Sequence, residues 1–153
     1  MNVHFSHKSD CWETPPELFS VYDREFHFDC DVAADHENTK VKDNWIAEGS
    51  DALKCPWGGR NWCNPPYSKV LDFTKKATEE AQKGNLTVML IPARTDTRFF
   101  HDYIYNKPNV EVRFLKGRVK FINPNGKLLR GTKMNGSNNA APFPSMIVVF
   151  KPL

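Results

Sequence analysis

The sequence predicts an α/β protein whose sheet is mostly parallel and carries a C-terminal antiparallel hairpin strand. Helical and strand patterns alternate along the chain, an order typical of helices packed on a parallel sheet. The continuous apolar run at 85–93 is typical of a strand buried on both faces. The dipeptide Asn125-Gly126 is a hairpin signal, and the apolar segment 145–150 follows it as a final strand.

The first predicted element is a helix at 14–26. Thr14 is expected to cap it, because its hydroxyl can accept a hydrogen bond from the first turn and two prolines follow at the first helical positions. Residues 26–34 alternate apolar and polar side chains, which indicates a strand of period two. Residues 35–60 show no sustained period, so we expect irregular connections with one short helix or strand near Trp45.

Two further patterns surround a pair of prolines. Residues 60–64 form a short predicted strand, which Pro65 and Pro66 end because proline cannot continue a sheet ladder. An amphipathic helix follows at 68–84, with Ser68 as the expected N-cap and a glycine at its end. The other expected elements are a helix at 96–106, a strand at 109–117, a hairpin at 119–130 and a long loop at 131–144.

Length and composition indicate a single globular domain over residues 1–153. The chain has 40% hydrophobic and 25% charged residues and a net charge of +3, which argues against the disordered and membrane classes. Its four cysteines form no Cys-x-x-Cys pair, so neither a zinc site nor a disulfide framework is expected. Without an apolar signal region or a run long enough to span a bilayer, we expect a reduced, cytoplasmic protein with no membrane or metal partner.

The string Asn64-Pro65-Pro66-Tyr67 follows the strand at 60–64, at the edge where open α/β sheets bind ligands. The carbonyl of Pro65 is not used by a helix, because another proline follows it. That carbonyl and the Asn64 amide oxygen make two neighbouring acceptors, which suit a planar amino group with two hydrogens. Tyr67 supplies a flat surface on which the ring bearing that amine can stack.

The same string suits methylation of a planar amine such as N6 of adenine. The lone pair of such an amine is delocalised into its ring, and two acceptors can localise it on nitrogen without a strong base. A fixed orientation toward a methyl sulfonium contributes the rest, up to about 7–11 kcal/mol. Inside a duplex the amine is unreachable, so the base would be flipped out. A rigid strand end without chemistry is the other interpretation of these four residues.

Five strings stand in order along the chain: "WETPPELF", "FDCDVAA", "NWCNPPYS", "LIPARTDTRFF" and "FLKGRVKF". Together they resemble the phage-type DNA N-6-adenine methyltransferases, a Dam-like family, and the resemblance covers nearly the whole chain. It implies a Rossmann-like methyltransferase fold, S-adenosylmethionine as methyl donor and DNA adenine as acceptor. It also implies the cytoplasm of a bacterial host cell, if the chain is phage-encoded.

The resemblance implies roles for particular residues. Residues 64–67 match the catalytic motif of the family. Thr14 and Pro15 match an N-terminal element that helps to hold the methionine part of the cofactor. Asp31 with Ala33 lies where the first cofactor-binding strand ends, and an aspartate there suits the cofactor's ammonium group.

Three more positions belong to the cofactor side of the resemblance. Asp51 fits an acidic position that contacts the adenine or ribose of the cofactor. Asn38 and Lys40 match an Asn-x-Lys element to which we assign no chemical role. The chain departs from the wider pattern where "DVAAD" replaces the glycine-rich turn after the first strand, so close approach to the cofactor relies on alanines.

Target recognition is expected after the catalytic motif, since only about 30 residues separate that motif from the cofactor strand. We predict a recognition hairpin or loop at 122–145, with a solvated loop as the alternative. Its basic side chains suit phosphates and its asparagines suit base edges. The basic residues are Lys127, Arg130 and Lys133, and the asparagines are Asn125, Asn135, Asn138 and Asn139.

Arg94, Asp96 and Arg118 are further candidates for contacts with the substrate. Arg94 and Asp96 follow the buried strand, where they either shape the target pocket or form a local ion pair. Arg118 either meets a phosphate or is a solvated surface charge.

The sequence therefore predicts a site-specific DNA adenine-N6 methyltransferase. Two other functions stay open. One is methylation of another planar amine or amide, such as an RNA base or a glutamine side chain. The other is a catalytically weak or degenerate methyltransferase fold that binds DNA or a protein, which the missing glycine turn favours.

Overall fold

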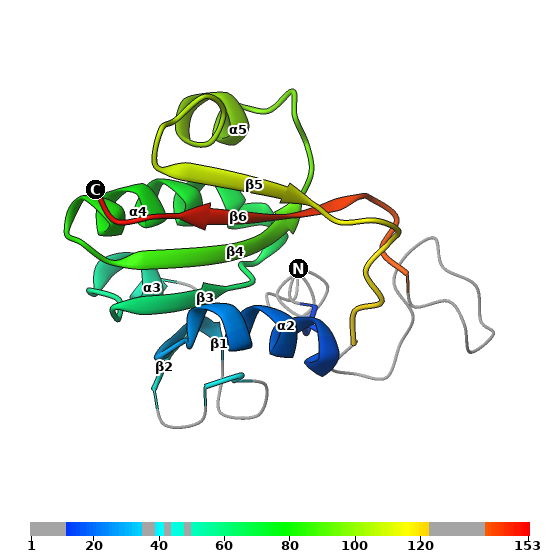
Figure 1. Ribbon diagram of the computed structural model, residues 1–153, viewed down its shortest axis with the longest axis horizontal. Helices are drawn as coiled ribbons and strands as arrows, with labels where there is room; N and C mark the ends of the chain where they lie inside the picture. The colour runs from blue at the N-terminus through cyan, green and yellow to red at the C-terminus, as the bar shows by residue number, and fades with distance from the viewer. Residues whose placement is uncertain (1–11, 35–38, 42–43, 48–49, 123–139) are drawn as a thin grey trace, which may run out of the picture.

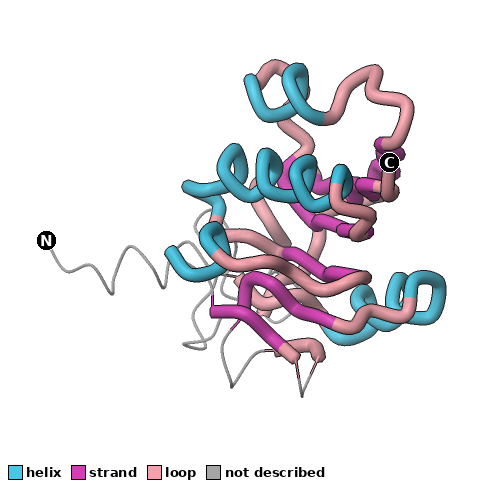
Figure 2. The backbone as a smooth tube through the Cα atoms, turned by 90° about the vertical axis from the view of Figure 1, so that its left-hand side faces the viewer, coloured by secondary structure: helices cyan, strands magenta, loops and turns pink. Residues whose placement is uncertain are grey.

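The structure is a mixed six-stranded sheet with helices on both faces (Figures 1 and 2). The computed structural model describes residues 12–34, 39–41, 44–47, 50–122 and 140–153. Its helices are α2 (Pro16–Phe26), α3 (Ser50–Lys54), α4 (Val70–Gln82) and α5 (Arg98–Tyr103), with a 3-10 turn, η1, at Tyr67–Lys69. Its strands are β1 (Cys30–Ala34), β2 (Trp45–Ala47), β3 (Arg60–Cys63), β4 (Leu86–Pro92), β5 (Val110–Phe114) and β6 (Ser145–Phe150).

The strands lie in the order β2-β1-β3-β4-β6-β5. The first four in this order are parallel to one another. β6 lies between β4 and β5 and is antiparallel to both, in register from Thr87↔Phe150 to Pro92↔Ser145 along β4. The predicted α/β class and the antiparallel final strand are confirmed, whereas the hairpin signal at 125–126 lies outside the described residues.

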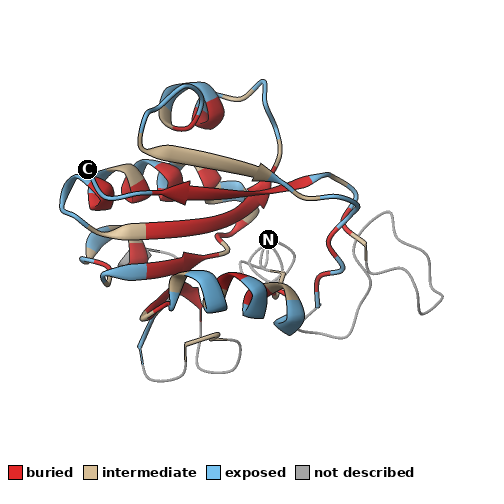
Figure 3. Cartoon of the chain, in the orientation of Figure 1, coloured by how far each residue is buried: buried red, intermediate tan, exposed pale blue. Residues whose placement is uncertain are grey.

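Two clusters of buried side chains fill the space between the sheet and its helices. The buried residues are red in Figure 3 and cover most of β4 and β6. One cluster lies under α3, α4 and α5, and the other lies under α2 and residues 119–121. Successive strand residues point to opposite faces, so Trp62 joins the α2 cluster while Cys63 joins the other. β4 contributes to both clusters, and it is buried at every position after Leu86, as its continuous apolar run predicts.

The strand predicted at 26–34 is shorter and does not follow a period of two. α2 extends to Phe26, and His27 ends it with a left-handed φ of 54°. β1 begins only at Cys30, and all five of its residues are buried. Neighbouring strands lie on both sides of it and side chains cover both faces, which removes the alternation of a half-exposed strand. Phe28 lies in the connection and packs into the α2 cluster.

Neither predicted N-cap forms. Pro15, not Thr14, is the N-cap of α2, and no side chain caps that helix. α4 has Lys69 as its N-cap, again without a side-chain cap, and Ser68 lies within η1 instead. Proline precedes both starts, since Pro15 leads into α2 and Pro66 into η1. A preset proline φ thus replaces the expected hydroxyl caps.

The structure also contains the other predicted elements described here, but their first and last residues differ from the prediction. A short strand does begin at Trp45, and α4 is followed by Gly84 at a φ of +94°, a left-handed conformation that glycine adopts without strain. The helix expected at 96–106 is shorter than predicted. Among the helices of the described residues, none is both long and apolar enough to cross a membrane.

Candidate active site

The parallel strands bring several predicted site residues to one edge of the sheet. The carboxyl ends of β1, β3 and β4 share this edge, which is the end to which the β5 arrow points in Figure 1. Residues 64–67 follow β3 directly, and Arg94 and Asp96 follow β4. Because β6 is antiparallel, its first residues also lie here, and the amide of Ala93 donates to the carbonyl of Pro144 at 2.9 Å.

The amide of Asn64 is held by residues that come 50 or more positions earlier in the chain. Its Nδ2 donates to the backbone carbonyl of Trp12 at 2.5 Å and to Thr14 Oγ1 at 3.1 Å. A carbonyl oxygen can only accept, so the Trp12 contact fixes which end of the amide is nitrogen. Within the described residues no group donates to Asn64 Oδ1. The side chain thus keeps one acceptor available at a half-buried position.

The two prolines after Asn64 are both buried. The carbonyl of Pro66 accepts from the amide of Lys69 at 2.9 Å, which closes the η1 turn. No hydrogen bond to the carbonyl of Pro65 occurs in the described part of the chain. The turn therefore uses the second proline carbonyl and leaves the first one available, next in sequence to Asn64.

Two aromatic side chains from separate segments pack against Tyr67. Its ring meets the ring of Phe143 edge to face, with centroids 5.2 Å apart, and that of Phe121 with centroids 6.3 Å apart. The guanidinium of Arg94 lies 5.8 Å from the centre of the Phe143 ring. No ion pair joins Arg94 to Asp96 in the structure, and both side chains are exposed, so the local pair considered for them is absent.

Asp31 lies almost fully buried in β1, with 3% of its surface exposed. Its carboxylate accepts from the backbone amides of Lys40 at 2.8 Å and Ala33 at 3.4 Å. The ammonium of Lys40 lies 3.8 Å from the Glu13 carboxylate. Lys40 of the Asn-x-Lys element therefore links the buried aspartate of β1 to the segment that holds Asn64, whereas Asn38 lies outside the described residues.

Cys63 directly precedes Asn64, and its thiol is fully buried. Burial raises the pKa of this thiol well above its ordinary value, and the nearby charge of Asp31 raises the pKa further. Burial likewise raises the pKa of Cys30 to about 11. Both groups stay protonated at neutral pH, so neither is a thiolate nucleophile for a covalent reaction at this edge.

The other predicted site residues are less closely grouped. Pro15 and Ala33 are buried, and Arg118 is exposed beyond the end of β5. Asp51 belongs to α3, but its side chain is outside what the structure describes. Lys127, Arg130 and Lys133 also lie outside the described residues. In the described part of the chain, no group of three or more His, Cys, Asp or Glu residues is placed to hold a metal ion.

Sequence reasoning missed three residues at this edge. Trp12 acts through its backbone carbonyl, for which a sequence carries no signal. Phe121 belongs to the predicted hairpin at 119–130 and Phe143 to the predicted loop at 131–144, and neither segment indicates a contact with the motif. The available signal was the aromatic residue between two prolines in "APFP", since a large apolar side chain in a turn-rich segment usually packs against something.

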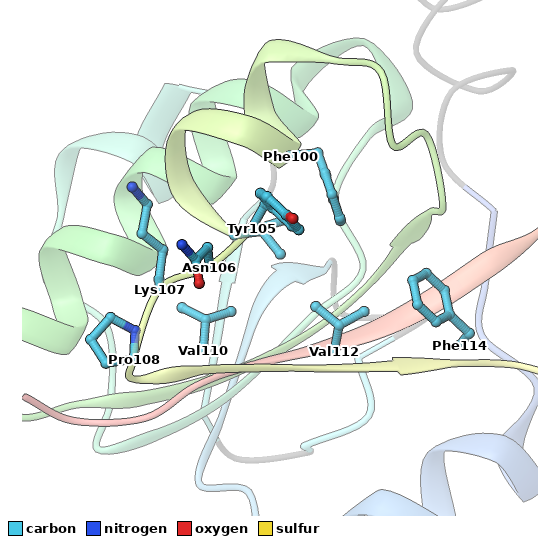
Figure 4. A pocket seen from close by; sticks show the side chains of 9 residues that line it. Phe100, Tyr105, Asn106, Lys107, Pro108, Val110, Val112 and Phe114 are labelled. Carbon is cyan, nitrogen blue, oxygen red and sulfur yellow. The ribbon is translucent and has the colours of Figure 1, made fainter.

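A cavity of about 400 Å³ lies elsewhere, between α5 and β5 (Figure 4). Tyr105, Val110 and Phe114 are among its lining residues, and the side chains of Val110 and Val112 point from β5 toward α5. None of the residues of the predicted site lines this cavity. It is therefore a separate feature of the sheet's β5 side.

An α/β sheet with an Asn-Pro-Pro-Tyr turn at the carboxyl edge of its parallel strands is compatible with a methyltransferase-like fold. The model of the family described as "DNA N-6-adenine-methyltransferase (Dam)" matches residues 3–153. The chain belongs to this family, which confirms the resemblance seen in its five strings.

Two phage proteins share much of the sequence. The DNA N-6-adenine-methyltransferase of Haemophilus phage HP1 is 34% identical over 147 residues, which cover 94% of this chain and 79% of that protein. The DNA N-6-adenine-methyltransferase of Escherichia phage T1 is 35% identical over 104 residues, which cover 66% of this chain and 43% of that protein.

Proposed function

We propose that this protein, a DNA N-6-adenine methyltransferase by family, transfers a methyl group from S-adenosylmethionine to N6 of an adenine flipped out of the duplex. The observation that carries the proposal is the state of Asn64. Both hydrogens of its amide are used by Trp12 and Thr14. Its oxygen has no donor among the described residues, and neither has the carbonyl of Pro65, the next residue in the sequence. Two acceptors without a hydrogen of their own suit a target that has two hydrogens to donate.

The chemistry follows from these two acceptors. When bound, S-adenosylmethionine supplies an electrophilic methyl group on a positively charged sulfur. Asn64 Oδ1 and the Pro65 carbonyl accept the two N6 hydrogens and draw the lone pair onto nitrogen, where it can attack. Neither acceptor is basic enough to keep a proton, so the methylated amine loses its extra proton to water. Orientation rather than strong-base catalysis is the main contribution.

The residues of β1 fit a cationic cofactor. Asp31 places a carboxylate in the strand, and the small side chain of Ala33 lets a ligand approach the backbone closely, which a glycine turn does in the wider pattern. We assign cofactor contacts to Pro15, Ala33 and Asp51, and to Asp31 an effect of its charge on the cofactor. The buried position of Asp31 supports an electrostatic role more than direct contact, since backbone amides already bind its oxygens.

The target base is proposed to stack on Tyr67. Phe121 and Phe143 both pack edge to face against this ring, so its position is restricted before a base arrives. Arg94 lies beside Phe143 and, with Asp96, borders the same edge. Stacking on a fixed aromatic ring is worth about 1–3 kcal/mol per base.

DNA recognition is proposed for residues 122–145, helped by Arg118. Bridges at both ends of this segment support the proposal. Ile122 pairs with Glu13, and Lys120 pairs with Ala140, so the segment starts and finishes near the residues that hold Asn64. Lys127, Arg130 and Lys133 then supply positive charge for phosphates.

The test is transfer of label from methyl-labelled S-adenosylmethionine to unmethylated DNA, followed by digestion to nucleosides. We expect the label in N6-methyladenine. Label in RNA or in a glutamine peptide, but not in DNA, would mean that the acceptor is that substrate and not DNA adenine. Cofactor binding without any transfer would leave a DNA-binding or protein-binding module, and loss of cofactor binding as well would remove the methyl donor from the proposal.

A further inference from the structure

Residues 12–14 contact the side chain of Asn64, the first residue of the Asn-Pro-Pro-Tyr motif. Resting on the function proposed above, we infer that Thr14, together with the backbone carbonyl of Trp12, is a positioning group that sets the orientation of the Asn64 amide. Thr14 was assigned to the cofactor by resemblance, and its hydroxyl lies instead against the amide of the catalytic motif. The inference gives it an effect on the rate of transfer rather than on cofactor affinity.

The segment 12–14 is itself firmly held. The amide of Glu13 donates to the carbonyl of Ile122 at 3.0 Å, and the amide of Ile122 donates back at 2.9 Å. The Glu13 side chain faces Lys40, and Pro15 follows as the N-cap of α2. Thr14 is only 2% exposed. A hydroxyl in such a place has little freedom to move, so its hydrogen bond restricts the orientation of the Asn64 amide.

Orientation matters because an amide has two different ends. If the side chain were turned by 180°, Oδ1 would face the carbonyl of Trp12, and two acceptors would meet without a proton between them. The same turn would present N–H groups to the adenine amine, which has hydrogens to donate and cannot accept them well. The contacts to Trp12 and Thr14 therefore select the one orientation that binds the proposed substrate.

The chain offers a matched control for this contact. Asn61 Nδ2 lies 3.4 Å from Thr87 Oγ1, and both residues are fully buried. This second asparagine–threonine pair lies at the other end of β3, beside the first residues of β4. Removing the Thr87 hydroxyl thus repeats the chemical change at Thr14 away from the proposed site.

The experiment compares Thr14→Val, Thr14→Ser and Thr87→Val in the full chain. Valine keeps the shape of threonine and loses the hydroxyl, while serine keeps the hydroxyl. We expect Thr14→Val to lower kcat by roughly 10- to 100-fold, the scale of a misplaced catalytic group. Its affinity for S-adenosylmethionine, measured by calorimetry, should stay within about twofold of wild type, and Thr14→Ser should recover most of kcat. Thr87→Val should lower Tm and leave kcat unchanged.

Three results would overturn the inference. They are an unchanged kcat in Thr14→Val, a loss of cofactor affinity with kcat retained, and a Thr14→Ser variant as slow as Thr14→Val. If wild type itself transfers no methyl group to DNA, the proposed function fails while the positioning contact can still be measured. Side-chain amide hydrogen exchange of Asn64, followed by NMR against Asn61 as reference, should then accelerate in Thr14→Val only. Equal exchange rates in wild type and the variant would end the inference.

Discussion

Asn61 and Asn64 lie three positions apart, at opposite ends of β3, and the structure uses them in opposite ways. Asn61 is fully buried, and every part of its amide is bonded. Its Oδ1 accepts from the amide of Gly58, and its Nδ2 lies within hydrogen-bond distance of the Gly58 and Leu86 carbonyls and of Thr87 Oγ1. Asn64 has only its nitrogen occupied. The first asparagine holds the sheet together, and the second leaves an acceptor for a substrate.

The difference shows how the two edges of a parallel sheet diverge. At the amino edge, turns return into the sheet and their polar groups satisfy one another. Ligands of open α/β sheets bind at the carboxyl edge, so a polar atom there that lacks a partner within the protein can bind a ligand. An amide that is half satisfied is costly when buried and useful when a ligand completes it. The four variants below test this division, in order of expected effect.

Asn64→Ala should give the largest change. It removes the proposed acceptor, and we expect methyl transfer to fall by at least about 10²–10³-fold, the usual cost of deleting one preorganised polar group at a reacting centre. Affinity for S-adenosylmethionine and Tm should stay close to wild type. Single-turnover transfer and calorimetry measure the two quantities. An equal loss of transfer and of cofactor affinity in a folded variant would contradict the assignment of Asn64 to the acceptor amine.

Asn61→Ala should act on stability instead. It removes the side-chain partner of the Gly58 amide and of the Leu86 carbonyl at a fully buried position, which should lower the free energy of unfolding by about 2–4 kcal/mol. Urea denaturation measures this value. The fraction that remains folded should keep the wild-type kcat, and a drop in kcat at full folding would mean that the two asparagines are not separate in function.

Asn64→Asp tests the fixed orientation through its pH dependence. A carboxylate oxygen would then face the carbonyl of Trp12, and this repulsion should raise the pKa of the introduced acid above its ordinary value of about 3.9. The neutral acid can donate to that carbonyl at low pH, whereas the charged form cannot. The variant should therefore match wild-type Tm best near pH 4 and fall progressively below it as pH rises to 7. A constant difference across this range would contradict the proposed geometry.

Glu80→Gln should have the smallest effect of the four variants. Like Asn61→Ala, it should change stability and not methyl transfer. Glu80 is fully buried in α4, where burial alone would raise its pKa, but hydrogen bonds from Asn85, Lys83 and the amide of Trp57 outweigh burial and leave the pKa below its ordinary value. Its charge thus stabilises the fold above the ordinary pKa, and this contribution is lost as pH falls through the lowered one. Glu80→Gln should cost about 1–3 kcal/mol at pH 7 and progressively less in acid, with kcat unchanged. Urea titrations at several pH values would show a flat difference if the charge were unimportant.

Much of the fold follows from local pattern, and the site follows only in part. The apolar run of β4 and the amphipathic face of α4 specify buried elements whatever surrounds them. The predicted capping role of Thr14 is wrong for a physical reason, since a hydroxyl that can cap a helix can equally bind an amide 50 residues away. Local sequence cannot decide between two partners of similar strength, and here the prolines already start the helix.

The same limit applies to the environment of the motif. Tyr67 was identified with its motif, but Phe143 sits in a segment whose composition indicates a turn. Its position beside Tyr67 depends on β6 running antiparallel next to β4, a long-range pairing. The bonds of Asn64 to residues 12 and 14 depend on the same kind of long-range closure. The residue types at the site were therefore predictable, and the contacts that orient them were not.

The position of β6 also sets an order of assembly. β5 is made well before β6, yet in the described part of the chain it pairs with β6 alone and has no ladder to join until that strand is present. The sheet is thus completed when β6, the last strand in the sequence, inserts between β4 and β5. Because Phe143 and Pro144 enter with that strand, the ring beside Tyr67 arrives in the same step. During synthesis, residues 64–67 are therefore made before Phe143, and completion of the sheet is the step that packs Phe143 against the ring of Tyr67.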